Sequence, residues 1–387
     1  MLALARPLGV DTVALGEAAG RTLAEDITAT RNQPPFRASA MDGWAVRAED
    51  ATAGARLAIA GESAAGRGYA FDLEPGQAVR IFTGAPVPAG SDAVVIQENA
   101  TRDGESVVIG EAATPGANLR PEGGDFFAGE DLLQAGYRLD AWRISLAAAA
   151  GCASLSVARR PRVAILSTGD EIVLPGATPG PHQIFNSGAP ALAVLVEHWG
   201  GEPVLLTPAG DNIEVLASAV RNQSCDVVVT IGGASVGDHD LVKPALSTLG
   251  LTLAFESLKM RPGKPTSFGT LLDGRYVLGL PGNPASALVC AELFLRPLIA
   301  ALQGSDPSLP IMTARTAAAL PSNGPREHWM RARLSNANGV LTVAPFGDQD
   351  SSLITVFAGA NALLRRPCDA PAAAVGDVVE VLRLERL

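Results

Sequence analysis

The stretch 226–243, "DVVVTIGGASVGDHDLVK", decides the fold class of this chain. Its β-branched run at 227–231 predicts a buried strand, and the glycines that follow predict a turn with close backbone approach. Residues 240–250, "DLVKPALSTLG", then have the spacing of a helix. A strand, a glycine-rich turn and a helix in this order are the repeating unit of a parallel sheet covered by helices.

The same unit recurs on both sides of this stretch. "RVAILST" (162–168) and "YVLGLPG" (276–282) are further apolar strand candidates, while "SGAPALAVLVEHWGG" (187–201) and "NIEVLASAVRN" (212–222) have helical spacing. We therefore predict a doubly wound parallel α/β domain with helices on both faces. Ligands of such sheets bind beyond the carboxyl ends of the strands.

The rest of the chain predicts a helical linker and two β-rich parts. Residues 15–24, "LGEAAGRTLA", have apolar side chains on one helical face, and "RLDAWRISLAAAAG" (138–151) reads as a helix with Asp140 as its N-cap and Gly151 just past its end. The predicted parts are, in order, 1–28 (first half of the linker), 29–124 (inserted β-rich module), 125–158 (second half of the linker), 159–305 (α/β domain) and 306–387 (small β barrel).

The two β-rich parts are predicted from different patterns. Residues 73–99, "LEPGQAVRIFTGAPVPAGSDAVVIQEN", are short apolar segments broken by Gly and Pro, which is typical of a small β module. In the tail, "HWMRARL" (328–334), "VLTVAP" (340–345) and "DVVEVLRL" (377–384) alternate between apolar and polar residues. This alternation favours a small β barrel or sandwich.

Composition excludes several classes of function. At 387 residues the chain is long enough for several domains, and its net charge of −10 argues against a broad nucleic-acid or acidic-membrane surface. The 4 Cys contain no CxxC pair and the 4 His are scattered, so a zinc cluster is not expected. Without a signal-peptide pattern at the start or an apolar run of roughly 20 residues, we expect a reduced cytoplasmic protein.

Polar loops follow all three strand candidates and are expected at one sheet edge. They are "STGDEIV" (167–173), "GGASVGDHDLVK" (232–243) and "PGNPASALVCAELF" (281–294). The glycines of the second loop let backbone N–H groups approach a phosphate, and the third loop precedes a helix whose N-terminus favours an anion. The alternative is that these are ordinary structural turns, since Gly-rich turns occur in any sheet of this kind.

Acidic and basic side chains accompany these loops. Asp170, Glu171, Asp211, Asp238 and Asp240 offer hard oxygen ligands of the kind that Mg²⁺ prefers, although Asp211 or Asp240 could instead be an N-cap. The segment "LKMRPGKPTSFG" (258–269) adds Lys259, Arg261 and Lys264, which would form an oxyanion pocket or, alternatively, a solvated turn.

A second group of polar residues belongs to the β module. Asp42 lies between Met41 and Trp44, and an acid among apolar neighbours is costly unless a donor, cation or partner meets it. Thr83 lies in a proline-stiffened turn. Arg120 precedes Asp125 by five residues in "NLRPEGGDFFAGE" (118–130). These residues gain a functional meaning only if the module faces the active edge of a sheet.

Six segments in this order carry a resemblance to a known family: "SAMDGWAV" (39–46), "RIFTGAPVPAGSDAVV" (80–95), "STGDEIV" (167–173), "GGASVGDHDLVK" (232–243), "MRPGKPTSFG" (260–269) and "LPGNPASALV" (280–289). On them the chain resembles the molybdopterin molybdenumtransferases, the MoeA and gephyrin E-domain family, over nearly its whole length. The resemblance implies a multidomain α/β plus β fold: a helical linker, an inserted β-rich module, an α/β molybdopterin-binding domain and a C-terminal β barrel.

The resemblance also implies a reaction and an assembly. The family inserts molybdenum from molybdate into adenylylated molybdopterin, with Mg²⁺ present and AMP released. Its active cleft lies between the α/β domain of one subunit and the inserted module of the other, so a homodimer is expected. Other proteins of molybdenum cofactor biosynthesis are further expected partners, whereas nucleic acid and membrane are not.

The resemblance carries the following roles to this sequence. The expected catalytic residues are Asp42, Thr83, Glu171, Asp211, Asp240 and Lys264, of which Glu171, Asp240 and Asp42 would hold Mg²⁺. The expected substrate-binding residues are Arg120, Asp125, Gly232, Gly233, Ser235, Gly237, Lys243, Arg261, Pro281, Pro284, Ser286, Arg331 and Ser352. Two positions depart from the family pattern, because Ser257 and Arg261 each stand where lysine is common.

Two other functions compete with this one. The first is adenylylation of molybdopterin by a related single-domain family, which shares the glycine loop but lacks the module and the barrel. The second is a non-catalytic dimeric scaffold, a role that the gephyrin E-domain also has.

Overall fold

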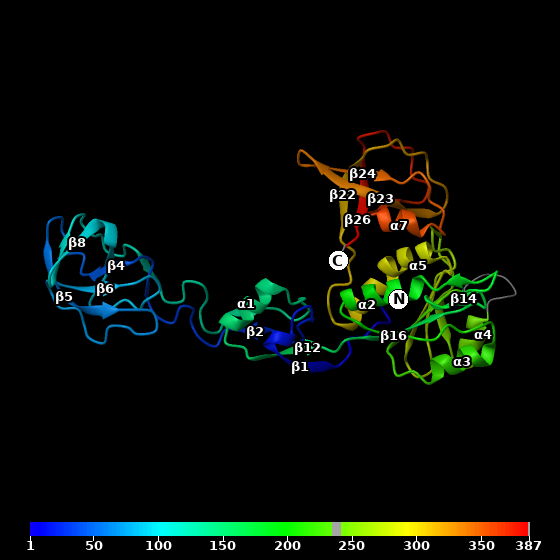
Figure 1. Ribbon diagram of the computed structural model, residues 1–387, viewed down its shortest axis with the longest axis horizontal. Helices are drawn as coiled ribbons and strands as arrows, with labels where there is room; N and C mark the ends of the chain where they lie inside the picture. Colours follow the sequence, from blue (N-terminus) through cyan, green and yellow to red (C-terminus); the bar gives the residue numbers. More distant parts are fainter. Residues whose placement is uncertain (234–240, 386–387) are drawn as a thin grey trace.

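Four parts follow one another along an elongated molecule (Figure 1). The computed structural model describes residues 1–233 and 241–385. The β module forms one end of the molecule and the α/β domain the other, with the linker between them and the C-terminal barrel beside the α/β domain. The predicted multidomain architecture is confirmed, while the domain boundaries themselves stay predictions.

The α/β domain is built on a sheet of six strands, and its first four strands are parallel, as predicted. The last two strands extend the sheet at one edge, and each pairs antiparallel with the strand before it in the spatial order. In spatial order the strands are β16 (Glu202–Leu205), β13 (Arg162–Ser167), β17 (Val227–Ile231), β21 (Tyr276–Leu280), β20 (Ser267–Thr270) and β18 (Thr252–Phe255).

Helices cover both faces of this sheet, again as predicted. Val227, Val229 and Ile231 of β17 pack into a core with α2 (Gly188–His198) and the helix that follows β21. Val228 points the other way, into a second core with the remaining helices. Those helices are α3 (Ile213–Arg221) and α4 (Val242–Ser247).

The helix after β21 is the longest of the part of the chain that the structure describes. It runs from Pro284 to Leu302 through α5 (Pro284–Cys290), a π turn (Ala291–Leu295) and α6 (Arg296–Leu302). By length and composition alone it could cross a membrane, but 78% of its most apolar window is buried. Its apolar residues belong to the core of the α/β domain.

The linker corrects one prediction. Residues 15–24 do not form the expected α-helix. A 3-10 turn, Leu15–Glu17, is the helical structure present there. The preceding β1 (Val10–Ala14) pairs with β12 (Ser154–Ala158), and the amides of Leu15 and Leu23 bond to carbonyls of distant residues. Tertiary pairing therefore takes the backbone groups that a helix would have used. The second predicted helix is confirmed as α1 (Ala141–Ala149), with the Asp140 side chain accepting the Arg143 amide at 2.9 Å.

The β module is a six-stranded sheet in the order β7 (Ala93–Ile96), β4 (Gly43–Val46), β6 (Gln77–Ile81), β5 (Arg56–Ser63), β9 (Ser106–Ile109) and β8 (Ala100–Asp103). Two short pairs lie where the module meets the linker: β3 (Ala38–Ser39) with β10 (Leu119–Arg120) at the base of the module, and β2 (Ile27–Thr28) with β11 (Asp131–Leu133) in the linker. The module has its own buried core, so it is a separate folding unit in packing terms.

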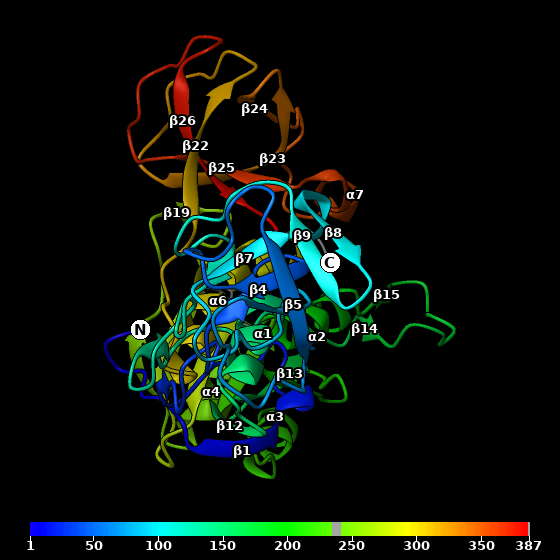
Figure 2. The ribbon, with the colours of Figure 1, turned by 90° about the vertical axis from the view of Figure 1, so that its left-hand side faces the viewer.

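The C-terminal part is a closed barrel of five strands (Figure 2). The circuit runs β23 (Glu327–Ala337), β24 (Val340–Pro345), β22 (Ile311–Thr316), β26 (Val378–Arg383), β25 (Ala362–Arg366) and back to β23. A strand of the α/β domain, β19 (Met260–Arg261), adds to it in parallel with β23. The basic segment therefore joins the two domains.

Candidate functional site

A cavity of about 810 Å³ opens at the carboxyl ends of β13, β17 and β21. All three predicted loops line this edge cavity, so their expected convergence is confirmed. The lining residues are Ser167–Gly169, Glu171, Ile172, Ile184–Gly188, Asp211, Ile231–Gly233, Pro265, Pro281–Pro284, Ser352 and Ile354.

The first loop presents a carboxylate to the cavity. Gly169 has φ 131°, and a Cβ there would lie 2.4 Å from Glu171 Oε2, so only glycine lets the Glu171 side chain fold back over the backbone. Asp170 accepts the Asp211 amide at 3.1 Å and thereby ties this loop to the next one. Glu171 and Asp211 line the cavity, and neither carboxylate has a hydrogen-bond partner among the described residues. The cap of α3 is Asn212, not Asp211.

The second loop brings backbone close to the first. Gly232 (φ 94°) and Gly233 (φ 61°) line the cavity, and a Cβ at Gly232 would lie 2.8 Å from the Thr168 carbonyl oxygen. The predicted residues Ser235, Gly237, Asp238 and Asp240 lie outside the described residues. The described part of this loop therefore contributes backbone rather than side chains.

The third loop places a helix N-terminus at the cavity. Pro281, Asn283 and Pro284 line it, and Asn283 Nδ2 donates to Ser351 Oγ of the barrel at 2.8 Å. Ser286 is buried at 3% exposure inside α5 and lies outside the described lining residues. Of the first helical residues only Pro284, which has no N–H group, is among the described lining residues, so the backbone N–H groups available there are those of Gly282 and Asn283.

The barrel closes one side of the edge cavity. Ser352 and Ile354 line it, with Ile354 at the start of α7 (Ile354–Gly359). The Ser352 hydroxyl and amide donate to Asp350 Oδ1 at 2.6 and 2.8 Å and lower the pKa of Asp350. Arg331 is 1% exposed, and its Nη1 donates to the Asp350 carbonyl at 2.7 Å. Arg331 thus holds the loop that carries Ser352.

The basic segment concentrates positive charge beside the cavity. Arg261 Nη2 donates to His328 Nδ1 at 2.9 Å. Burial, followed by the charges of Arg261, Arg331 and Arg326, lowers the pKa of His328 to about 4, so this imidazole is neutral at pH 7. Arg261 and Lys264 are exposed and lie outside the described lining of the edge cavity.

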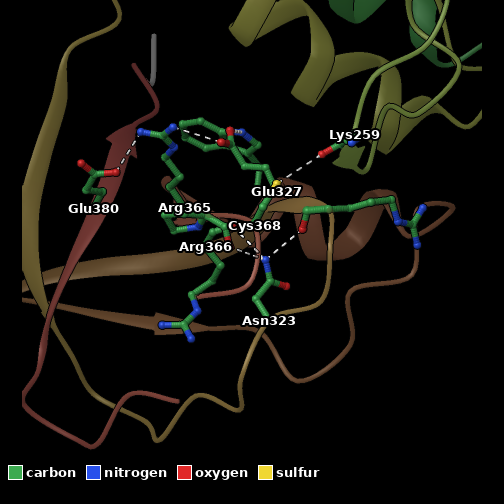
Figure 3. Close-up of polar contacts among 10 residues, drawn as sticks. Lys259, Asn323, Glu327, Arg365, Arg366, Cys368 and Glu380 are labelled. Atoms are coloured by element: carbon green, nitrogen blue, oxygen red, sulfur yellow. Dashed lines mark hydrogen bonds and ion pairs between the residues drawn. The ribbon is translucent and has the colours of Figure 1, made fainter. Parts of the chain in front are cut away.

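The barrel fixes the position of this segment through its backbone (Figure 3). The Lys259 carbonyl accepts the Glu327 amide at 2.8 Å, and the Cys368 thiol lies 3.9 Å from the same oxygen. Glu327 is in turn paired with Arg365 at 3.0 Å, and Arg365 with Glu380 at 2.9 Å. Arg261 therefore lies on an interdomain strand and Lys259 directly before it, whereas Lys264 lies in the turn that follows.

Lys243 belongs to a different cavity. A side cavity of about 180 Å³ is lined by Thr230, Gly233, Val242, Lys243, Leu246, Leu251, Leu253, Glu256, Ser257, Pro265, Ser267, Val277 and Gly279. Lys243 forms an ion pair with Glu256 there. Ser257, one of the two positions that depart from the family pattern, lines this cavity too.

The module holds Asp42 in a defined turn. The amide and hydroxyl of Thr83 both donate to Asp42 Oδ1 at 2.7 Å, and these bonds, the amide first, lower the pKa of Asp42. Trp44 is buried at 4% exposure, as expected, but Met41 is 43% exposed and does not bury the acid. Asp42 is an ionised group that the module presents to its surface.

Arg120 and Asp125 are also exposed, near the junction of the module and the linker. Within one chain the module lies at the opposite end of the molecule from the α/β domain (Figure 1), whose strand ends form the edge cavity. The structure therefore does not bring Asp42, Thr83, Arg120 and Asp125 together with Glu171 in a single protomer. The predicted site residues of one chain are therefore divided between the module and the α/β domain.

Metal ligands are likewise divided. Among residues 1–233 and 241–385, no group of three or more His, Cys, Asp or Glu side chains is placed to hold a metal ion. Glu171 and Asp211 are the carboxylates of the described edge cavity, while Asp42 is in the module. The carboxylates of Glu171 and Asp211 fit Mg²⁺ in type, but the described residues alone do not supply a complete set of ligands at the edge cavity.

Sequence reasoning missed one wall of the cavity. The parallel pair β14 (Ile172–Val173) and β15 (Ile184–Phe185) brings Ile172, Ile184 and Phe185 to the lining. Asn186 is 5% exposed, and its Oδ1 accepts the Ser167 hydroxyl at 3.1 Å and the Ala189 amide at 3.2 Å. The signal was "FNSG" (185–188), a polar run directly before a helix.

The fold and the cavity define a class: a multidomain protein with an α/β core whose small-molecule site lies at the carboxyl edge of the sheet. Three family models match the chain in order, namely the MoeA N-terminal region (domain I and II) at 1–151, the probable molybdopterin binding domain at 164–301 and the MoeA C-terminal region (domain IV) at 313–384. The chain belongs to the MoeA family.

Similar proteins cover the chain almost completely. A molybdopterin molybdenumtransferase of Nostoc sp. is 39% identical over 97% of this chain and 88% of its own length. Molybdopterin molybdenumtransferase 2 of Mycobacterium tuberculosis is 37% identical over 98% of this chain and 96% of its own length. The crystal structure of a molybdopterin biosynthesis MoeA protein from Pyrococcus horikoshii superposes with a TM-score of 0.84 at 31% identity, covering 100% of this chain and 97% of that one.

Proposed function

We propose that this protein is a molybdopterin molybdenumtransferase, which inserts molybdenum from molybdate into adenylylated molybdopterin and releases AMP. The observation that carries the proposal is the edge cavity of about 810 Å³, which combines glycine backbone, two carboxylates without hydrogen-bond partners among the described residues, and a barrel hydroxyl. Relatives that bear this name match nearly the full length of the chain.

The cavity supplies what an anionic substrate needs. The glycine loop, together with Gly282 and Asn283 just before the Pro284–Leu302 helix, offers backbone N–H groups to phosphate oxygens. The basic segment and Arg331 provide a positive field in a protein whose net charge is −10. Arg261, Lys264 and Ser352 would hold molybdate, since a dianion that approaches an anionic dithiolene requires charge compensation.

Glu171 and Asp211, completed by Asp240 and by Asp42 of a partner, would hold Mg²⁺. The bound ion would neutralise charge on the phosphoanhydride that is cleaved. The chain's own contribution is to position the carboxylates. Gly169 leaves room for the Glu171 side chain to fold back over the backbone, and the hydrogen bond from the Asp211 amide to the Asp170 side chain fixes the loop of Asp211. Asp42 stays ionised because Thr83 donates two hydrogen bonds to it.

The active assembly would be a homodimer in which the module of one subunit covers the edge cavity of the other. The separation of the two partial sites within one chain supports this arrangement. A cytoplasmic location and exchange of the cofactor with other biosynthetic proteins would follow from the same function.

The test is to incubate the purified protein with adenylylated molybdopterin, Mg²⁺ and molybdate. We expect molybdate-dependent AMP release and a product that reconstitutes an apo-molybdoenzyme. An adenylyltransferase would instead consume ATP and release pyrophosphate, and a scaffold would produce neither nucleotide product. Either of those results would contradict the proposal.

A further inference from the structure

The side cavity adjoins the edge cavity, because Gly233 and Pro265 line both. Its volume of about 180 Å³ is well above the roughly 10–15 Å³ that one ordered water requires. It is also below the about 300–1,000 Å³ of a typical pocket for a complete ligand. The side cavity is therefore suited to one part of a ligand whose remainder occupies the edge cavity.

The floor of the side cavity is a row of residues across three neighbouring strands. Gly279 of β21 is in register with Thr230 of β17 on one side and with Ser267 of β20 on the other. A Cβ at Gly279 would lie 2.4 Å from Ser267 Oγ and 3.6 Å from Thr230 Oγ1. The missing side chain leaves a flat patch of backbone with a hydroxyl group on each side.

One of these hydroxyl groups is unusual. Thr230 is 1% exposed, and its Oγ1 has no hydrogen-bond partner among the residues that the structure describes. A buried hydroxyl without a partner is destabilising, and most such groups in folded proteins are paired. Thr230 lines the side cavity, and its hydroxyl group is a donor and acceptor that the described residues leave unused.

The walls have a different chemistry from the floor. Val242 and Leu246 of α4 and Leu251 and Leu253 beside and on β18 are apolar, and the Lys243–Glu256 pair adds charge. Apolar walls pack against the faces of a flat ring, while hydroxyl groups bond to nitrogen atoms at its edge. This combination selects a planar nitrogen heterocycle over an inorganic anion.

We infer that the side cavity binds the purine ring of the substrate's adenylate group, while the phosphate and the pterin occupy the edge cavity. The inference rests on the proposed function, which supplies an adenylylated substrate. Thr230 and Ser267 would bond to the ring edge, and Leu246 and Leu253 would pack on its faces. All of these residues belong to the described chain.

Calorimetric titration of the full-length protein with AMP tests this assignment. Thr230→Val keeps the shape and removes the hydroxyl, so we expect AMP binding to weaken roughly three- to tenfold. Leu253→Phe fills the cavity and should weaken AMP binding by more than about tenfold. Molybdate binding should not change in either variant. Thr252→Val, on the exposed face of the same strand, is the matched control and should bind AMP normally.

Thermal unfolding of the free protein separates binding from a structural role. Because Thr230→Val removes an unpaired buried hydroxyl, the variant should melt at the same temperature as the wild type or higher. A lower melting temperature together with unchanged AMP affinity would mean that Thr230 serves the fold, and the inference would be overturned.

Two further outcomes also decide the matter. If both cavity variants bind AMP like the wild type, the side cavity holds only water. If they lose affinity for a fluorescent pterin but keep it for AMP, the ring has been assigned wrongly. A wild-type protein that binds neither AMP nor pterin would contradict the proposed function itself, whereas one that binds pterin alone would contradict only the purine site.

Discussion

The two ends of this molecule treat carboxylates in opposite ways. In the β module, Asp42 is at the surface, and two hydrogen bonds from Thr83 keep it ionised. In the α/β domain, Glu292 is 4% exposed on the π turn, and burial raises its pKa to about 7 despite the nearby Arg296. The Glu171 carboxylate, at the edge cavity, has neither a hydrogen-bond donor nor an ion-pair partner among the described residues.

The difference teaches which acids are available for chemistry. Asp42 and Glu171 are ready to meet a ligand or a second chain, whereas Glu292 is committed to an ion pair with Arg296 at 3.4 Å, which in turn contacts Glu385 at 2.8 Å. Through Glu385, this network links the α/β domain to the segment that follows the last strand of the barrel. Each of the following predictions would sharpen or break this division.

The largest effect is expected from separating the two partial sites. Asp42→Ala and Glu171→Ala should each fold normally and lower AMP release by roughly 100-fold or more. Mixing the two variants under conditions of subunit exchange should restore about a quarter of the wild-type rate, because half of the dimers are mixed and one of their two sites is intact. The measurement is AMP release before and after exchange.

Each variant mixed with itself is the control for this experiment and should stay inactive. Failure of the mixed sample to recover, with mixed dimers verified, would mean that Asp42 and Glu171 act within the same subunit or not at all.

A moderate effect on stability is expected at Glu292. A carboxyl group whose folded pKa is raised contributes stability that is fully present below about pH 4.5 and is lost as the pH rises through about 7. Glu292→Gln should therefore unfold like the wild type near pH 4.5 and be more stable at pH 8, by up to about 3 kcal/mol. Denaturant unfolding across this pH range measures the difference.

Arg296 keeps Glu385 as a partner in this variant, so no buried charge is left alone. Glu197→Gln on the exposed surface of α2 is the matched control, and its stability should follow that of the wild type at every pH. A wild-type protein that grows more stable relative to Glu292→Gln with rising pH would contradict the assignment.

The smallest effect is expected at Thr83. Thr83→Val removes one of the two donors to Asp42, so the pKa of Asp42 should rise and the acid limb of AMP release should move to higher pH. On that limb we expect a loss of roughly three- to tenfold, with little change near neutral pH. Thr83→Ser keeps the hydroxyl group and should retain the wild-type pH profile of AMP release. An equal shift of the acid limb in both variants would mean that the Thr83 hydroxyl does not set the pKa of Asp42.

Part of the candidate site was predictable because it depends on local pattern. The carboxyl ends of parallel strands meet at one edge, so the loops that contain Glu171, Gly232 and Pro281 were expected together, and they are. Ser286 was expected beside them, but its helix turns it into the core. Lys243 was expected there too, yet it lines the side cavity. One helical turn can redirect a side chain in a way that residue type does not reveal.

The sequence by itself determined the strand–turn–helix order, the two faces of the sheet, the Asp140 cap and the glycines at strand ends, because hydrophobic period and backbone freedom act over a few residues. Only the tertiary structure decided that residues 15–24 bond to distant parts of the linker instead of forming a helix, and that the basic segment joins the barrel. It alone placed the module that contains Asp42 at the opposite end of the molecule from the α/β domain that contains Glu171. These outcomes depend on backbone partners that are distant in the sequence or on the placement of domains, and neither can be read from the pattern of a few neighbouring residues.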